Sequence, residues 1–91
     1  MKVEFDPAKR DATLAERGLD MADATEVFAG QTITIEDDRR DYGEPRFISI
    51  GFHQSRMVII AWTPREDTRR IISMRKANDR EQERYGSRFE P

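Results

Sequence analysis

The chain has 91 residues, a mass of 10.7 kDa and a formal net charge of −2, which suits one domain and predicts no nucleic-acid partner by itself. Cysteine is absent, which excludes disulfides, thiolate metal sites and cysteine nucleophiles. Charged residues make up 37% of the chain, but five Phe and one Trp indicate a folded core. Because no apolar run reaches the ~18–20 residues of a membrane span and no signal segment opens the chain, we expect one cytoplasmic domain covering residues 1–91.

Two short helices are predicted near the start of the chain, after a possible very short strand at residues 3–5. Asp6 is placed to cap the first helix, which is expected over about residues 7–17. Asp20 repeats the capping pattern before an apolar stripe at helical spacing, which predicts a second helix over about residues 21–29.

The hydrophobic period then changes from that of a helix to that of a strand. The predicted strands are residues 32–35, 47–52, 57–63 and 68–76. A charged loop over residues 36–45 is expected to be too polar to bury, and residues 53–56 are short enough for a hairpin. Asn78 and Glu81 have the spacing of a capping box, which predicts a last helix ending near Tyr85.

This order of elements predicts an α+β architecture. Two N-terminal helices are expected to pack on one face of a twisted antiparallel sheet of three to four strands, with a C-terminal helix in addition. The other face is expected to be partly open to solvent. On the last strand, Ile72 and Met74 are expected to point inward and Ser73 and Arg75 to lie on the open face, and Trp62 is expected in the core.

Charge is distributed unevenly along the chain. Residues 1–45 carry six basic and twelve acidic side chains, whereas residues 46–91 carry ten basic and six acidic ones. The basic residues are thirteen Arg and three Lys, and a guanidinium group can bind phosphate oxygens through two parallel hydrogen bonds. The pattern favours an anion-binding surface and a second surface for a basic partner, with chance and genomic base composition as the alternative explanations.

Several side chains are candidates for a functional site, although a solvated or packing role is the alternative for each. Arg70 and Arg75 lie near the ends of the last predicted strand. Glu81 and Tyr85 are one turn apart on the last helix and therefore face the same way. Lys9 lies in the first turn of a helix, where the helix dipole disfavours a cation, so a ligand or an acidic partner is a reason for its position.

Other polar residues are weaker candidates. His53 is the sole histidine and has no Glu, Asp or Ser at triad or metal-site spacing, so we expect a surface turn residue. Asp37, Asp38 and Asp41 lack the glycine and terminal glutamate of a calcium loop and are expected in a solvated loop or at a docking site for a basic segment. There is no glycine-rich phosphate loop, zinc-ligand pair or cofactor motif, so neither a metal nor a cofactor is predicted.

Five sequence segments are distinctive when taken together. They are Phe5-Asp6-Pro7-Ala8-Lys9, Gly18-Leu19-Asp20, Glu26-Val27-Phe28, Asp41-Tyr42-Gly43-Glu44-Pro45-Arg46-Phe47 with Gly51, and Arg70-Ile71-Ile72-Ser73-Met74-Arg75-Lys76-Ala77 followed by Glu81 and Tyr85. They cover nearly the whole chain, and the last is the most specific. In this order they resemble the BrnT family.

The resemblance implies a RelE-like fold and the function of a type II toxin, namely a small metal-independent endoribonuclease that cleaves RNA and halts translation. It also implies a BrnA-like antitoxin, whose DNA-binding domain brings operator DNA to the complex, and no membrane partner. RNA cleavage without metal needs an aligned 2′-hydroxyl, stabilisation of charge on the phosphate and a proton donor for the leaving oxygen. The candidates for phosphate binding are Arg46, Arg70 and Arg75, and those for proton transfer or positioning are Tyr85, Lys9 and Glu81.

One position departs from the family pattern. The family usually has Lys-His-Gly at the end of the first helix, whereas this chain has Glu16-Arg17-Gly18. If the family histidine moves a proton, an arginine supplies charge there but no base near neutral pH. Because the first half of the chain is also acidic, the alternative function is a catalytically silent module that partners a basic DNA-binding protein in a repressor complex.

Overall fold

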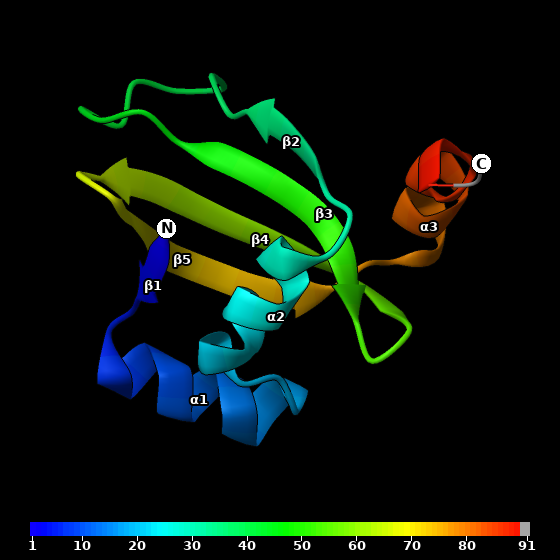
Figure 1. Ribbon diagram of the computed structural model, residues 1–91, viewed down its shortest axis with the longest axis horizontal. Coiled ribbons are helices and arrows are strands. Elements are labelled where there is room, and N and C mark those ends of the chain that lie inside the picture. The colour runs from blue at the N-terminus through cyan, green and yellow to red at the C-terminus, as the bar shows by residue number, and fades with distance from the viewer. Residues whose placement is uncertain (90–91) are drawn as a thin grey trace.

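The fold is built on a mixed five-stranded sheet (Figure 1). The computed structural model describes residues 1–89. The strands are β1 (Lys2–Glu4), β2 (Ile33–Glu36), β3 (Phe47–His53), β4 (Arg56–Arg65) and β5 (Thr68–Lys76), arranged in the order β1-β5-β4-β3-β2. All the strands predicted from the hydrophobic period are therefore present.

The prediction of a wholly antiparallel sheet of three to four strands was wrong. The strands β2 to β5 are antiparallel neighbours, but β1 pairs with β5 in parallel, beginning with Lys2 opposite Thr68. This pairing joins the two ends of a long chain segment. Local sequence signals describe short antiparallel connections well and contain no information about such a distant partner.

The helices begin where their capping residues predict. They are α1 (Pro7–Arg17), α2 (Ala24–Ala29) and α3 (Asp79–Gly86), with 3-10 turns at Met21–Asp23 and Ser87–Phe89. Asp6 caps α1 by accepting a hydrogen bond from the Ala8 N–H, and Asn78 and Glu81 form the predicted capping box of α3. The helical segment predicted over residues 21–29 differs in one respect, since its first turn is a 3-10 turn. None of the helices described here is long and apolar enough to cross a membrane.

The main core lies between the sheet and the two N-terminal helices, α1 and α2 (Figure 1). Its buried residues are Leu19, Met21, Ala24, Val27, Val58, Ile60, Trp62, Ile71 and Met74. Trp62 packs against the rings of Phe28 and Phe47, and its indole N–H donates a hydrogen bond to Ser49 at 2.8 Å, which confirms its predicted core position. A Cβ atom on Gly51 would lie 2.7 Å from Val27 Cγ1, so the close approach of α2 to β3 depends on glycine.

A β-bulge interrupts β5 at Ile72. Consecutive residues of β4 pair with Ile71 and Ser73, so Ile72 is an extra residue without an opposite partner. As a result Ile71 and Met74, three positions apart, both enter the core with exposures of 1% and 0%. The prediction for Met74 is confirmed, and the prediction that Ile72 points inward was wrong, because it assumed uninterrupted alternation along the strand.

The sheet face opposite α1 and α2, called the open face below, is covered at one end by α3. There Tyr85 and Phe89 pack against a second cluster of Ile50, Met57, Ile59 and Ala77. Figure 1 shows α3 beside one end of the sheet, away from α1 and α2. The remainder of this face has no helix over it among the described residues, in agreement with the partly open face expected from the sequence.

Candidate functional site

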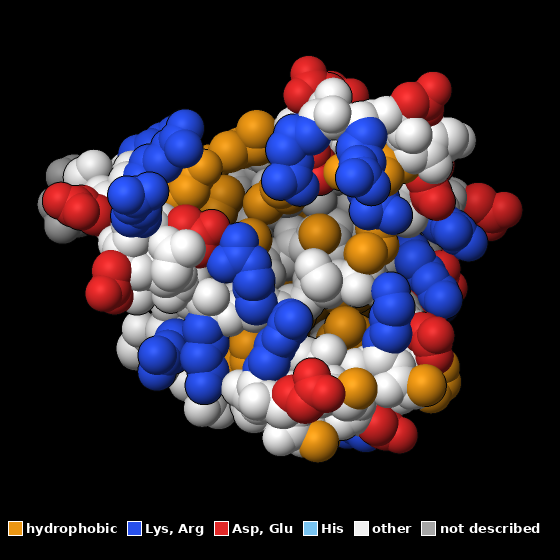
Figure 2. Space-filling model, turned by 180° about the vertical axis from the view of Figure 1, so that it is seen from behind, with side chains coloured by type: hydrophobic (Ala, Val, Ile, Leu, Met, Phe, Trp, Pro, Cys, Tyr) orange, Lys and Arg blue, Asp and Glu red, His pale blue; other side chains and the backbone are white. Residues whose placement is uncertain are grey.

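Cationic side chains gather on the open face. Arg70 pairs with Thr63 and Arg75 with Ile59, and because side chains alternate along β4, both arginines lie on this face. Figure 2, which views the molecule from behind Figure 1, shows Lys and Arg side chains around a central area of apolar and uncharged atoms. An anion on this face would therefore meet positive charge from several directions.

The first group of predicted residues surrounds a cavity of about 180 Å³, called the Lys9 cavity. Its charged lining residues are Asp6, Lys9, Glu44, Arg46, Arg65 and Arg70. Lys9 comes from α1, Arg46 precedes β3 and Arg70 belongs to β5. Arg65 and Arg70 have acidic neighbours at 3.6 and 3.9 Å, whereas Lys9 and Arg46 make no ion pair within residues 1–89. The cavity thus holds an excess of positive charge.

The second group lies at the α3 end of the open face. Arg75 donates two parallel hydrogen bonds to the Glu81 carboxylate, both at 2.8 Å, which raises the pKa of Arg75. The same contact lowers the pKa of Glu81 to about 2, so Glu81 is ionised near neutral pH. Tyr85 contributes its ring to the second core cluster, and Glu81 and Tyr85 line a cavity of about 240 Å³.

The six predicted site residues therefore form two separate groups and do not line one pocket. Arg70 and Arg75 are separated along β5 by roughly 15 Å, given a rise of about 3.3 Å per strand residue. Lys9, Arg46 and Arg70 line the Lys9 cavity. Arg75, Glu81 and Tyr85 form the separate group beside α3. Sequence reasoning did not single out Arg65 for the Lys9 cavity, although alternation from Thr63 places it on the same face.

The charged loop that precedes β3 is organised around a buried carboxylate. The side chain of Asp37 is only 5% exposed and accepts hydrogen bonds from Arg39 at 2.8 and 3.0 Å and from the Tyr42 hydroxyl at 3.3 Å. The bonds from Arg39 are the main reason that the pKa of Asp37 is lowered to about 2. The prediction of a wholly solvated loop was wrong at Asp37, because a carboxylate with these partners can be buried.

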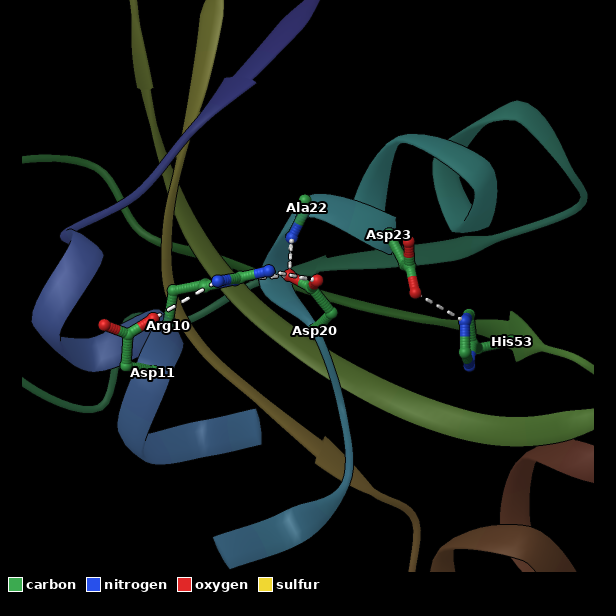
Figure 3. Close-up of polar contacts among 6 residues, drawn as sticks. All are labelled: Arg10, Asp11, Asp20, Ala22, Asp23 and His53. Carbon is green, nitrogen blue, oxygen red and sulfur yellow. Dashed lines mark hydrogen bonds and ion pairs between the residues drawn. The ribbon is translucent and has the colours of Figure 1, made fainter. Parts of the chain in front are cut away.

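An ion pair and a histidine–carboxylate hydrogen bond on the helix-covered side fix the N-terminal helices, and both are drawn in Figure 3. Arg10 on α1 donates to both Asp20 oxygens at 2.9 and 2.7 Å, which lowers the pKa of Asp20 to about 2. His53 Nε2 lies 3.1 Å from Asp23 Oδ2, so His53 is half-buried and partnered rather than the expected surface turn residue. Asp23, Glu26 and His53 could together offer donors to a metal ion, since one atom of each lies within 4.8 Å of the others.

Two other arginines have structural contacts. Arg17, which stands where the family usually has histidine, donates a hydrogen bond from Nη1 to the Met74 carbonyl of β5 at 3.0 Å. Arg69 is on the core side of β5, with its guanidinium carbon 4.1 Å from the centre of the Phe28 ring and 5.1 Å from that of Trp62. Burial lowers the pKa of Arg69. Neither residue lines the Lys9 cavity.

The depressed carboxyl pKa values predict a loss of stability in acid. Asp20, Asp37 and Glu81 have ordinary values of 3.8, 3.8 and 4.5, and in the fold each is lowered to about 2. Their contribution to stability is therefore complete above the ordinary values and is lost as pH falls toward 2. We expect the melting temperature, followed by circular dichroism, to be nearly constant from pH 7 to about 5 and to fall steadily below it. A triple variant with Asp20→Asn, Asp37→Asn and Glu81→Gln should show a shallower fall, and equal slopes for the variant and the parent would contradict the assignment.

Comparison with known protein families agrees with the sequence resemblance. A family model described as "Ribonuclease toxin, BrnT, of type II toxin-antitoxin system" matches residues 5–81. The match includes every residue of the Lys9 cavity together with Arg75 and Glu81, and Tyr85 lies beyond it. No curated protein matches the chain. Because the family match spans most of the sequence, the chain belongs to the BrnT family of ribonuclease toxins of type II toxin–antitoxin systems.

Proposed function

We propose that this protein is a metal-independent endoribonuclease that cleaves RNA at the Lys9 cavity and thereby inhibits translation. The observation that carries the proposal is the meeting of Lys9, Arg46 and Arg70, from three separate parts of the fold, around one cavity. Two of these cations have no ion-pair partner within residues 1–89, so their charge is available to a ligand. A phosphodiester is the anion that a ribonuclease must hold. The arrangement of two N-terminal helices on one face of the sheet, with the opposite face partly open, also supports a relationship to the RelE-like superfamily.

Each charged residue of the Lys9 cavity named below can be given a role in phosphodiester cleavage. The 2′-oxygen of RNA attacks the adjacent phosphorus, the bond to the 5′-oxygen breaks, and the products are a 2′,3′-cyclic phosphate and a 5′-hydroxyl. Arg46 and Arg70 bind the non-bridging oxygens, where charge increases in the transition state. Lys9 donates a proton to the leaving 5′-oxygen, and Glu44, in the same cavity, accepts the proton of the 2′-hydroxyl.

The residues beside α3 have supporting roles in this proposal. Glu81 is ionised, so it has no proton to donate. Its carboxylate accepts two hydrogen bonds from Arg75 and holds that guanidinium group in place. Arg75 then binds a phosphate of the RNA strand at a distance from the cleaved bond, on the same face. Tyr85 packs α3 against the sheet.

We further propose that a BrnA-like antitoxin neutralises the toxin and connects the complex to operator DNA through its own DNA-binding domain. Membership of a toxin–antitoxin family supports an antitoxin partner. The excess of acidic residues in the first half of the chain, twelve against six basic, supports contact with a basic segment. The structural contact of Arg17 with β5 favours the alternative of a silent binding module, because this arginine replaces a possible proton carrier. RNA binding with a steep salt dependence would distinguish a ribonuclease from such a module.

The expected reaction can be tested with a single substituted nucleotide. The parent protein in EDTA is expected to cleave single-stranded RNA and to leave cyclic-phosphate ends detectable by mass spectrometry. A 2′-deoxynucleotide on the 5′ side of the mapped cleavage position should abolish cleavage there, because it removes the attacking oxygen. A deoxynucleotide two positions away is the matched control and should have little effect. Cleavage that persists at the substituted position, or that stops in EDTA, would overturn the proposed mechanism.

A further inference from the structure

A second basic cavity adjoins the Lys9 cavity and has no role in the chemistry described above. It has a volume of about 450 Å³, is called the Arg40 cavity here, and is lined by Arg39, Arg40, Tyr42 and Arg46. Among the described residues no carboxylate lines it. Arg46 lines both cavities, so the two are neighbours on either side of this residue. Three guanidinium groups around one cavity are suited to an anion with several oxygens.

The loop that forms this cavity is held in shape by its own contacts. The Asp37 N–H donates to the Arg46 carbonyl at 2.8 Å, which closes the loop at its base. The buried Asp37 carboxylate binds Nε and Nη2 of Arg39 and the hydroxyl of Tyr42. Arg40 makes no ion pair within residues 1–89 and is exposed. The loop thus fixes its neighbours while leaving the charge of Arg40 unneutralised.

Arg46 connects the two cavities and has hydrogen-bonding capacity that the described protein does not use. Its guanidinium carbon lies 3.9 Å from the centre of the Tyr42 ring, a cation–π contact that holds the group beside the loop. Its Nε atom is buried and has no hydrogen-bond partner within residues 1–89. Arg46 also makes no ion pair within residues 1–89, so the charge of its guanidinium group is available to an anion that enters either cavity.

We propose that the Arg40 cavity is a second phosphate-binding subsite, which holds the RNA backbone phosphate next to the one that is cleaved. This inference rests on the proposed ribonuclease function. A single strand that enters the Lys9 cavity places its next phosphate within reach of the adjoining cavity, and Arg46 contacts the strand between the two. Arg40 supplies the free charge of the subsite, while Asp37 and Tyr42 position Arg39 and Arg46.

The test compares RNA ligands with one and with several phosphates. Both probes are non-cleavable 2′-O-methyl RNAs. Binding of a dinucleotide, which has one phosphodiester, is measured by chemical-shift titration. Binding of an octanucleotide is measured by fluorescence anisotropy. Arg40→Gln is expected to weaken octanucleotide binding about tenfold, because one charge-assisted contact is lost. It should also lower the slope of log K against log salt by about 0.7, the value for one phosphate on a single strand. Dinucleotide binding should be unchanged.

Arg56→Gln is the matched control, because Arg56 is an exposed arginine at the start of β4 that lines neither basic cavity. It should leave the binding of both probes close to that of the parent. Octanucleotide binding and salt slope unchanged in Arg40→Gln would overturn the subsite while leaving ribonuclease activity intact. If Arg40→Gln weakened the binding of both probes equally, the subsite would also be overturned, because Arg40 would then contribute only to the general charge of the surface. A parent protein that neither binds nor cleaves RNA would instead overturn the proposed function itself.

Discussion

Replacing Arg46 and Arg70 together with alanine is expected to lower kcat/KM for RNA cleavage by about 10³-fold or more, because removing even one group that stabilises transition-state charge typically costs about 10²–10³-fold. Both side chains line the Lys9 cavity, and neither belongs to a core cluster. Within residues 1–89 the ion pair of the Arg70 side chain is a long one, with Glu4 at 3.9 Å, so the fold should tolerate its loss. Initial rates on labelled single-stranded RNA measure the effect.

The control for this variant removes equal charge elsewhere. Arg56→Ala with Arg88→Ala takes two arginines away from positions outside the Lys9 cavity. At moderate salt, kcat/KM of this control should lie within a small factor of the parent value. Circular dichroism and melting temperature should show that both double variants are folded. Parent-like cleavage by the Arg46→Ala, Arg70→Ala protein would show that the reaction takes place elsewhere.

Replacing Trp62 with alanine is expected to destabilise the protein by about 3–5 kcal/mol, the usual cost of removing a large buried aromatic side chain. Trp62 is 8% exposed, packs against Phe28 and Phe47, and donates a hydrogen bond to Ser49. Small domains have a total stability of about 5–15 kcal/mol, so much of this variant could be unfolded at moderate temperature. Urea denaturation followed by far-ultraviolet circular dichroism measures the change.

Trp62→Phe is the matched comparison, because it keeps an aromatic ring but removes the indole N–H. Its loss should be clearly smaller, since Ser49 also bonds to the Thr34 hydroxyl at 2.8 Å and keeps that partner. If Trp62→Ala unfolded at the same urea concentration as the parent, the ring could not contribute to the core as described.

The parts of the fold that local signals determine were predictable from the sequence. Asp6, Asp20 and Asn78 each cap a helical segment at the predicted position, because a cap depends on residues within a few positions of it. The turn between β3 and β4 likewise falls within the predicted residues 53–56, at Gln54 and Ser55, which both have positive φ. The parallel pairing of β1 with β5 was not predictable in this way, since it depends on tertiary packing.

The candidate site was predictable in composition and only partly in arrangement. Residue type and family resemblance indicated Lys9, Arg46 and Arg70, and the structure brings them to one cavity. The pairing of Arg75 with Glu81 was not predicted, because Arg75 was expected to bind phosphate and Glu81 to transfer a proton or to position other groups. The burial of Asp37 was missed because its cost is offset only by hydrogen bonds that the folded loop provides.

The bulge at Ile72 has a consequence for the chemistry of the sheet. Arg70 and Arg75 are five positions apart, an odd spacing, so in a regular strand they would project in opposite directions. The unpaired Ile72 between them shifts the alternation of side chains along β5 by one residue. Both guanidinium groups therefore lie on the same side of the sheet. The number of residues between the two arginines therefore matters as much as their identity. A lineage that lost this one extra residue would keep both arginines in its sequence and yet divide the cationic surface between two sides of the molecule.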